Sequence, residues 1–182
     1  MENVRNNLDK NYAHAISTLK NCSYDSENKI YLCDFEEEVY DFDVIKERYC
    51  ERMRYKDMAS MDSLIEVNKK NMLFLVEFKN KDSLPYKDIR AKIHDSLFIM
   101  ENDFQVPREM FSMFELIVVY NPKKKQRTNL RGIREHFREL AGGEHDEIEH
   151  FQMFKDIYNI RSLKFSNVDF LDITLDVLIP TI

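Results

Sequence analysis

Residues 61–79 read MDSLIEVNKKNMLFLVEFK, and this stretch decides the fold. Within it, residues 61–67 and 72–79 form two runs rich in branched aliphatic and aromatic side chains, which is typical of β-strands. The intervening NKKN is polar and has the length that closes a hairpin. The sequence therefore predicts a β-hairpin near the centre of the chain.

The register of this hairpin follows from its turn. If Val67 pairs with Met72, counting back along both strands places Asp62 directly opposite Glu77. Side chains alternate between the two faces of a strand, so Lys79 lies on the same face as Glu77. The pattern predicts that Asp62, Glu77 and Lys79, which we call the charged trio, lie together.

The same alternation predicts which face of the hairpin is buried. One face is almost wholly apolar and is expected to be core, and it carries Met61, Ser63, Ile65, Val67, Met72, Phe74, Val76 and Phe78. The charged trio lies on the opposite face, together with Leu64, Leu73 and Leu75.

Two opposed carboxylates are a poor choice for stability. Side chains directly across a sheet have Cβ atoms about 5 Å apart, where two negative charges repel by roughly 3 kcal/mol at an effective dielectric constant of about 20. A divalent cation removes this repulsion, because carboxylates and waters are the ligands that Mg²⁺ and Mn²⁺ prefer. A lysine beside the ion could orient a water nucleophile or stabilise charge on a phosphoryl group. The trio therefore indicates metal-assisted phosphodiester hydrolysis with Mg²⁺ or Mn²⁺, and the alternative is an exposed ion pair that catalyses nothing.

Elements on both sides of the hairpin predict an α/β fold. Residues 114–120, FELIVVY, form a continuous apolar strand of the kind that lies inside a sheet covered on both faces. The spacing of apolar residues predicts helices at 4–19, 45–55, 84–101, 129–140 and 144–159, a strand or hairpin within 30–44, and an alternating strand at 171–179. This order predicts a single domain over residues 1–182, built on a mixed β-sheet flanked by helices.

An acid on one strand, Glu-Phe-Lys on the next strand and a helix after it resemble the catalytic core of the PD-(D/E)XK nuclease superfamily. The resemblance covers about residues 30–120 and implies a restriction-endonuclease-like fold with an α-β-β-β-α-β core. A basic helix and a C-terminal strand would follow it within 121–182. The chain departs from many members at Ser60-Met61, where they have a proline before the first acid.

The resemblance also implies roles for the residues that match the motif. Asp62 and Glu77 would bind the metal ion, with the backbone carbonyl of Phe78 as a further ligand. Lys79 would be the catalytic lysine.

The superfamily often adds one more acidic metal ligand from a preceding helix. Glu47 or Glu51 could supply it in this chain, and Glu36, Glu37 and Glu38 remain open.

Basic residues are candidates for contacts with a nucleic acid, DNA or RNA. Phosphate contacts need only positive charge on a reachable surface, and such charge gathers between residues 121 and 138. The candidates there are Lys123, Lys124, Lys125, Arg127, Arg131, Arg134 and Arg138. Lys87 and Arg90, on the helix predicted after the hairpin, would lie near the scissile phosphate in the superfamily's fold. The alternative is a solvated basic surface without a ligand.

The overall charge keeps a second function open. The net charge is −6, and residues 34–51 carry eight acids, which is unusual for a protein that grips a polyanion. The alternative is therefore a non-catalytic binding protein on the same fold, an immunity or regulatory protein whose acidic surface meets a basic protein partner. A homodimer is compatible with either function.

Composition bounds the class of protein. No run approaches the roughly 18 apolar residues of a membrane span, and the first residues lack an apolar signal core, so we expect a cytoplasmic protein with no membrane contact. Cys22, Cys33 and Cys50 are odd in number and widely spaced, and we expect reduced thiols.

Overall fold

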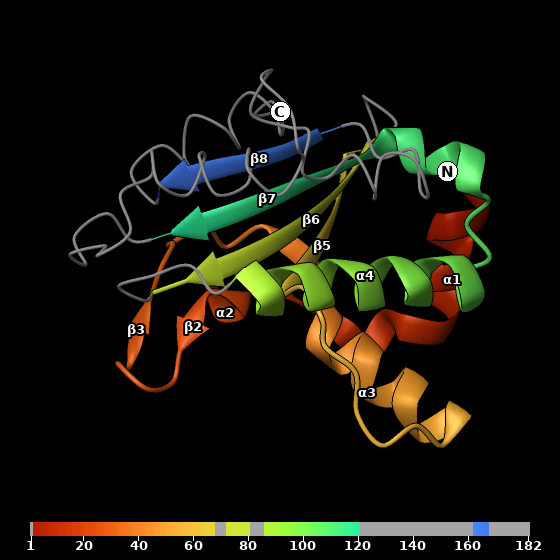
Figure 1. Cartoon of the computed structure of the whole chain (residues 1–182), viewed down its shortest axis with the longest axis horizontal. Coiled ribbons are helices and arrows are strands. Elements are labelled where there is room, and N and C mark those ends of the chain that lie inside the picture. The colour runs from red at the N-terminus through yellow and green to blue at the C-terminus, as the bar shows by residue number, and fades with distance from the viewer. Residues whose placement is uncertain (1, 68–71, 81–85, 121–161, 168–182) are drawn as a thin grey trace.

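The computed structural model describes residues 2–67, 72–80, 86–120 and 162–167 of the chain. A six-stranded sheet with the strand order β1-β4-β5-β6-β7-β8 lies at its centre (Figure 1). The strands are β1 (Ile16–Thr18), β4 (Glu38–Asp41), β5 (Ser63–Val67), β6 (Met72–Lys79), β7 (Phe114–Tyr120) and β8 (Ser162–Asn167). Strands β1, β4, β5 and β6 run antiparallel in turn, whereas β7 is parallel to β6 and β8 is parallel to β7. The predicted mixed α/β sheet is confirmed.

Helices pack against this sheet. They are α1 (Glu2–Tyr12), α2 (Leu19–Cys22), α3 (Phe42–Met53) and α4 (Tyr86–Asn102), with 3₁₀ turns η1 (Ala13–Ala15) and η3 (Arg108–Met113). Helix α3 begins after Asp41, whose carboxylate accepts hydrogen bonds from the backbone N–H groups of Asp43 and Val44 at 3.0 and 3.3 Å. Helix α4 lies in the crossover connection that the parallel strands β6 and β7 require.

A small second sheet lies beside the end of β6 (Figure 1). It pairs β2 (Tyr24–Asp25) with β3 (Ile30–Tyr31) as an antiparallel hairpin.

The central hairpin, β5 and β6, has the predicted register. Val67 pairs with Met72, and Ser63 pairs with Val76 at the start of β5. Asp62 immediately precedes β5, and its backbone N–H donates to the Val76 carbonyl at 2.9 Å. The pairing therefore continues as far as Asp62, which confirms that it lies opposite Glu77.

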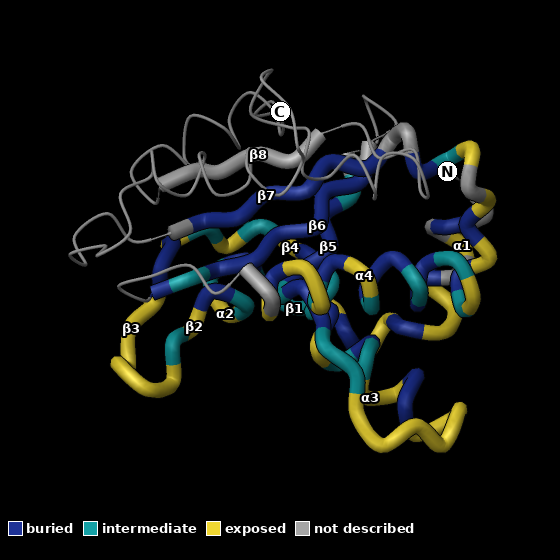
Figure 2. The backbone as a smooth tube through the Cα atoms, viewed as in Figure 1, coloured by how far each residue is buried: buried dark blue, intermediate teal, exposed yellow. Residues whose placement is uncertain are grey.

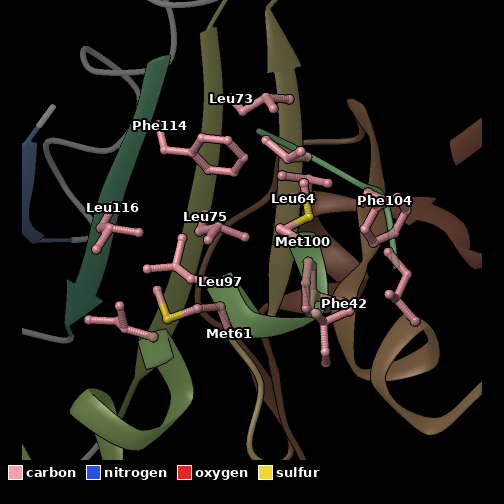
Figure 3. Packing of buried hydrophobic residues seen from close by; sticks show 14 of the residues in the cluster. Phe42, Met61, Leu64, Leu73, Leu75, Leu97, Met100, Phe104, Phe114 and Leu116 are labelled. Carbon is pink, nitrogen blue, oxygen red and sulfur yellow. The ribbon is translucent and has the colours of Figure 1, made fainter. Parts of the chain in front are cut away.

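The face of the hairpin that was predicted to be core is buried, but the implied contrast with the trio's face is wrong, because that face is buried as well (Figure 2). The larger apolar cluster lies on the face of the charged trio, where Leu64, Leu73 and Leu75 pack with residues of α1, α3 and α4 (Figure 3). The second cluster lies on the other face and includes Ile65, Phe74, Val76 and Phe78. Helices on the trio's face supply the apolar partners that the hairpin's own pattern could not reveal.

Two local predictions are also wrong. Met61 belongs to the larger cluster, because it precedes β5 and strand alternation does not govern its direction (Figure 3). The helix expected over residues 4–19 ends at Tyr12, after which the chain turns through η1 into the edge strand β1. The β-branched residues of β1 pair there with β4 instead of extending the helix.

The remaining predictions divide between the described and the undescribed residues. The helices at 129–140 and 144–159 and the strand at 171–179 lie outside the described residues, whereas β8 is a strand that the sequence did not predict. All three cysteines are free thiols, as expected. In the part of the chain that the structure describes, none of the helices combines the length and apolar character needed to cross a membrane.

We predict that Leu75→Ala lowers the free energy of unfolding by about 2–5 kcal/mol, because this fully buried side chain lies between β6 and the helices and its truncation leaves a cavity. Lys10→Ala on the exposed side of α1 is the control and should change it by less than about 0.5 kcal/mol. Chemical denaturation measures both. Equal effects of the two substitutions would mean that the trio's face of the sheet is not core.

Candidate active site

Asp62 is fixed in place by the strand beside it. Its Oδ2 accepts a hydrogen bond from the backbone N–H of Phe78 at 2.6 Å. That N–H belongs to the residue after Glu77, so the bond holds the Asp62 carboxylate at the end of β6. The Asp62 side chain is 16% exposed, whereas the Glu77 side chain is fully buried.

Lys92 reaches both acids from helix α4. Its Nζ lies 3.0 Å from Asp62 Oδ1 and 2.7 and 2.9 Å from Glu77 Oε1 and Oε2. Three carboxylate oxygens from two strands therefore converge on a single cation. Lys92 was not predicted as a site residue, although it follows Ile89 by three positions and thus shares the helix face that packs on the sheet.

Lys79 completes the arrangement. Its ammonium forms an ion pair with Glu77 Oε1, from two residues along the same strand face. Asp62, Glu77, Lys79 and Lys92, which we call the four-charge cluster, hold two negative and two positive groups. The two lysines thereby offset the repulsion that opposed acids would otherwise suffer.

Burial dominates the electrostatics of this cluster. Burial, reinforced by the neighbouring Asp62, raises the pKa of Glu77 to about 8 in spite of the two lysines. Burial alone would lower the pKa of Lys92, but the carboxylates of Asp62 and Glu77 outweigh it and the net pKa is raised. Lys92 therefore stays charged, and Glu77 is the group whose protonation changes near neutral pH.

A polar cleft of about 250 Å³ opens beside the cluster. Residues 22–27 around β2 and Leu32 form one wall, and Asp43, Asp62 and residues 78–80 form the rest. Among the members of the four-charge cluster, Asp62 and Lys79 line the cleft. These two are the members that a ligand in the cleft would meet.

Asp43 brings another carboxylate to the same cleft. It lies in the first turn of α3, accepts a hydrogen bond from the Ser60 hydroxyl and has Lys46 Nζ at 3.8 Å. Burial is the main cause of the raised pKa of Asp41, and the nearby carboxylates of Asp43 and Asp62 add to it, although Asp41 is outside the lining of the cleft. Asp43 was not predicted as a site residue, because the helix was expected to begin at residue 45.

The predicted third acid can now be compared with Asp43. Glu47 and Glu51 are exposed on α3, and the cleft is lined by Asp43, one helical turn before Glu47. Of the earlier candidates, Glu36 and Glu38 are exposed, and Glu36 accepts an ion pair from Lys20 at 2.8 Å.

Arg90 is the one predicted nucleic-acid contact whose side chain the structure describes. Arg90 is exposed on α4, and the side chain of Lys87 lies outside the described residues. The basic residues Lys123, Lys124, Lys125, Arg127, Arg131, Arg134 and Arg138 also lie outside them.

The acidic side chains of the site offer part of what the predicted divalent ion needs. Within residues 2–67, 72–80, 86–120 and 162–167, no three His, Cys, Asp or Glu side chains meet at a metal-binding distance. The oxygens of Asp62 and Glu77 do converge on one cation position, which is the chemistry that Mg²⁺ or Mn²⁺ needs. Lys92 occupies that position, so the residues fit a divalent ion only if the ammonium withdraws and waters complete the coordination.

Comparison of the chain with protein-family models, with curated proteins and with solved structures gave no match.

We predict that the metal-free protein loses stability between about pH 5 and about pH 8. The pKa of Glu77 rises from its ordinary 4.5 to about 8 on folding, so in this range the folded chain holds a proton that the unfolded chain has released. Stability gained by that protonation is present below the unfolded pKa and is lost as the pH rises through the folded pKa. Glu77→Gln should remove this pH dependence, on the order of a few kcal/mol.

Denaturation in EDTA at the two pH values provides the measurement. Glu38→Gln, at an exposed position of β4, is the matched control and should keep the wild-type slope. An unchanged slope in Glu77→Gln would show that Glu77 does not titrate in this range.

Proposed function

We propose that the protein is a metal-dependent nuclease of the PD-(D/E)XK type, hydrolysing phosphodiester bonds in DNA or RNA with Mg²⁺ or Mn²⁺. One observation carries the proposal: three oxygens of Asp62 and Glu77 lie within 3.0 Å of a single cation, the ammonium of Lys92. Lys79 is paired with the same Glu77 and lines an open cleft.

The arrangement of elements supports the proposal. The resemblance implies an α-β-β-β-α-β core, and here the antiparallel strands β4, β5 and β6 are followed by α4 and by β7, which is parallel to β6. The chain differs in having α3 between β4 and β5. That insertion brings Asp43 to the cleft beside Asp62.

Asp62 and Glu77 would hold the metal ion, with Asp43 and Glu47 as the candidates for a third carboxylate. When bound, such an ion supplies a Lewis acid and a water of lowered pKa. The ion and the Lys92 ammonium would compete for the same oxygens, because both need the point at which Asp62 and Glu77 converge. Metal binding also requires the proton of Glu77 to leave, so it becomes easier as the pH rises toward 8.

Lys79 would act on the substrate. Its ion pair with Glu77 anchors the ammonium, and its place in the wall of the cleft makes it reachable by a phosphate. There it would orient the attacking water and stabilise the charge that develops on the phosphoryl oxygens. Lys92 lies outside the lining of the cleft and would serve to position the two acids.

One observation favours the alternative, a non-catalytic protein on the same fold that binds a basic protein. The cleft is lined by Asp25, Glu27, Asp43 and Asp62 but by Lys79 alone among bases. An acidic cleft of this kind complements a positively charged side chain.

We expect wild-type protein with Mn²⁺ to cleave DNA or RNA, and Lys79→Ala to reduce the rate by about 100-fold or more through loss of charge stabilisation at the phosphate. Asp62→Asn should abolish cleavage. Lys10→Ala, remote on α1, should cleave like the wild type. Circular dichroism of each variant verifies its fold, and gel assays with labelled substrates follow cleavage.

Equal cleavage by wild type and Lys79→Ala would contradict the proposed role of the lysine. Absence of cleavage by the wild type on both nucleic acids would contradict the proposed function and favour the binding protein.

A further inference from the structure

Two tyrosines are displayed on the β2–β3 hairpin. Tyr24 and Tyr31 are paired across the two strands, with ring centroids 4.9 Å apart and ring planes at 43°. Both side chains remain largely in solvent, 46% and 49% exposed. The ammonium of Lys20 lies 5.6 Å from the centre of the Tyr31 ring. An aromatic pair with this much open surface can accept a further flat ring.

Hydrogen bonds within the hairpin that carries the rings fix its shape. The Ser23 hydroxyl accepts hydrogen bonds from the backbone N–H groups of Leu32 and Cys33 at 3.2 and 3.1 Å. The Asp25 carboxylate accepts the backbone N–H groups of Glu27 and Asn28, each at 3.0 Å, which closes the turn.

A further bond links the hairpin to the candidate active site. The side-chain amide of Asn80 donates to Asp25, and Asn80 directly follows Lys79. Tyr24 lines the same cleft as Asp62 and Lys79 (Figure 1 shows the hairpin beside the end of β6). The aromatic pair is therefore held at a fixed place next to the proposed catalytic lysine.

The charges around this surface select among nucleic acids. Asp25 and Glu27 line the cleft beside Tyr24, and the net charge of the chain is −6. Such a surface offers little electrostatic attraction to a phosphate backbone. Stacking on tyrosine needs no positive charge and works on every base, but it requires bases that are not already stacked in a duplex.

We propose that Tyr24 and Tyr31 form a stacking platform that binds the bases of single-stranded nucleic acid next to the cleft. This inference rests on the proposed nuclease function and deepens it, because it makes a single strand the substrate. The competing explanation is that the two rings only stabilise a short hairpin through their cross-strand contact.

The test measures binding apart from cleavage. Full-length Lys79→Ala protein in EDTA is titrated against labelled nucleic acids, and binding is followed by fluorescence anisotropy. The DNA ligands are a single strand, its duplex and an abasic strand of equal length. The single strand and the duplex are also tested as RNA. The single strand should bind about tenfold or more tightly than the duplex or the abasic strand, since stacking supplies the affinity.

Matched variants in the same Lys79→Ala background separate the platform from hairpin stability. Tyr24→Thr and Tyr31→Thr keep a β-forming residue but remove the ring, and each should weaken single-strand binding by about tenfold. Tyr24→Phe and Tyr31→Phe keep the ring and should bind as tightly as the parent protein.

Equal binding of the intact and the abasic strand by the parent protein would overturn the inference. Single-strand binding by the Thr variants as tight as that of the parent would overturn it too. This binding experiment and the cleavage assay can fail separately. Ring-dependent binding in a protein that never cleaves with Mn²⁺ would leave the platform and remove the nuclease, whereas cleavage with ring-independent binding would do the reverse.

Discussion

Two carboxylates meet where β5 begins and β6 ends, and the ammonium of Lys92 holds them together. Its three oxygen contacts, at 2.7 to 3.0 Å, join both strands of the hairpin to helix α4. The rest of the site depends on this interaction. Removing the ammonium would leave Asp62 and a fully buried Glu77 facing each other with only Lys79 to offset their repulsion. The strand register places the two carboxylates opposite each other. The crossover helix α4, which the parallel pair β6 and β7 requires, carries the ammonium that offsets their repulsion.

The same interaction explains how one set of residues can serve stability and chemistry. Asp62 and Glu77 present their oxygens to the Lys92 ammonium, and in the proposed enzyme the same oxygens would hold the divalent ion. Burial keeps the pKa of Glu77 near 8, which makes the carboxyl easy to protonate when the metal is absent. Asp62 and Lys79 line the cleft, so a substrate of the proposed nuclease would meet these two members of the four-charge cluster.

The features that could be predicted from the sequence are those that depend on residues close together in the chain, namely the hairpin register and the face on which each side chain lies. The polar turn sets the pairing of Val67 with Met72, and strand alternation then brings Glu77 and Lys79 to the same face as Asp62. Lys92 could not be placed in this way, because its contact depends on how α4 is rotated and translated over the sheet. Asp43 could not be placed from the sequence for a related reason. The N-cap at Asp41 starts α3 three residues earlier than expected, and this puts Asp43 rather than Glu47 beside the cleft. The second buried face of the hairpin likewise depends on helices that are distant in sequence.

The most direct test is a calorimetric titration of Mn²⁺ into wild type, Lys92→Gln and Asp62→Asn at about pH 8, where about half of the Glu77 carboxyl groups have lost their proton. We predict one Mn²⁺ bound per chain in the wild type, none in Asp62→Asn, and about tenfold tighter binding in Lys92→Gln, because the competing ammonium is gone. Failure of Mn²⁺ to bind either the wild type or a folded Lys92→Gln protein would contradict the claim that Asp62 and Glu77 form a divalent cation site.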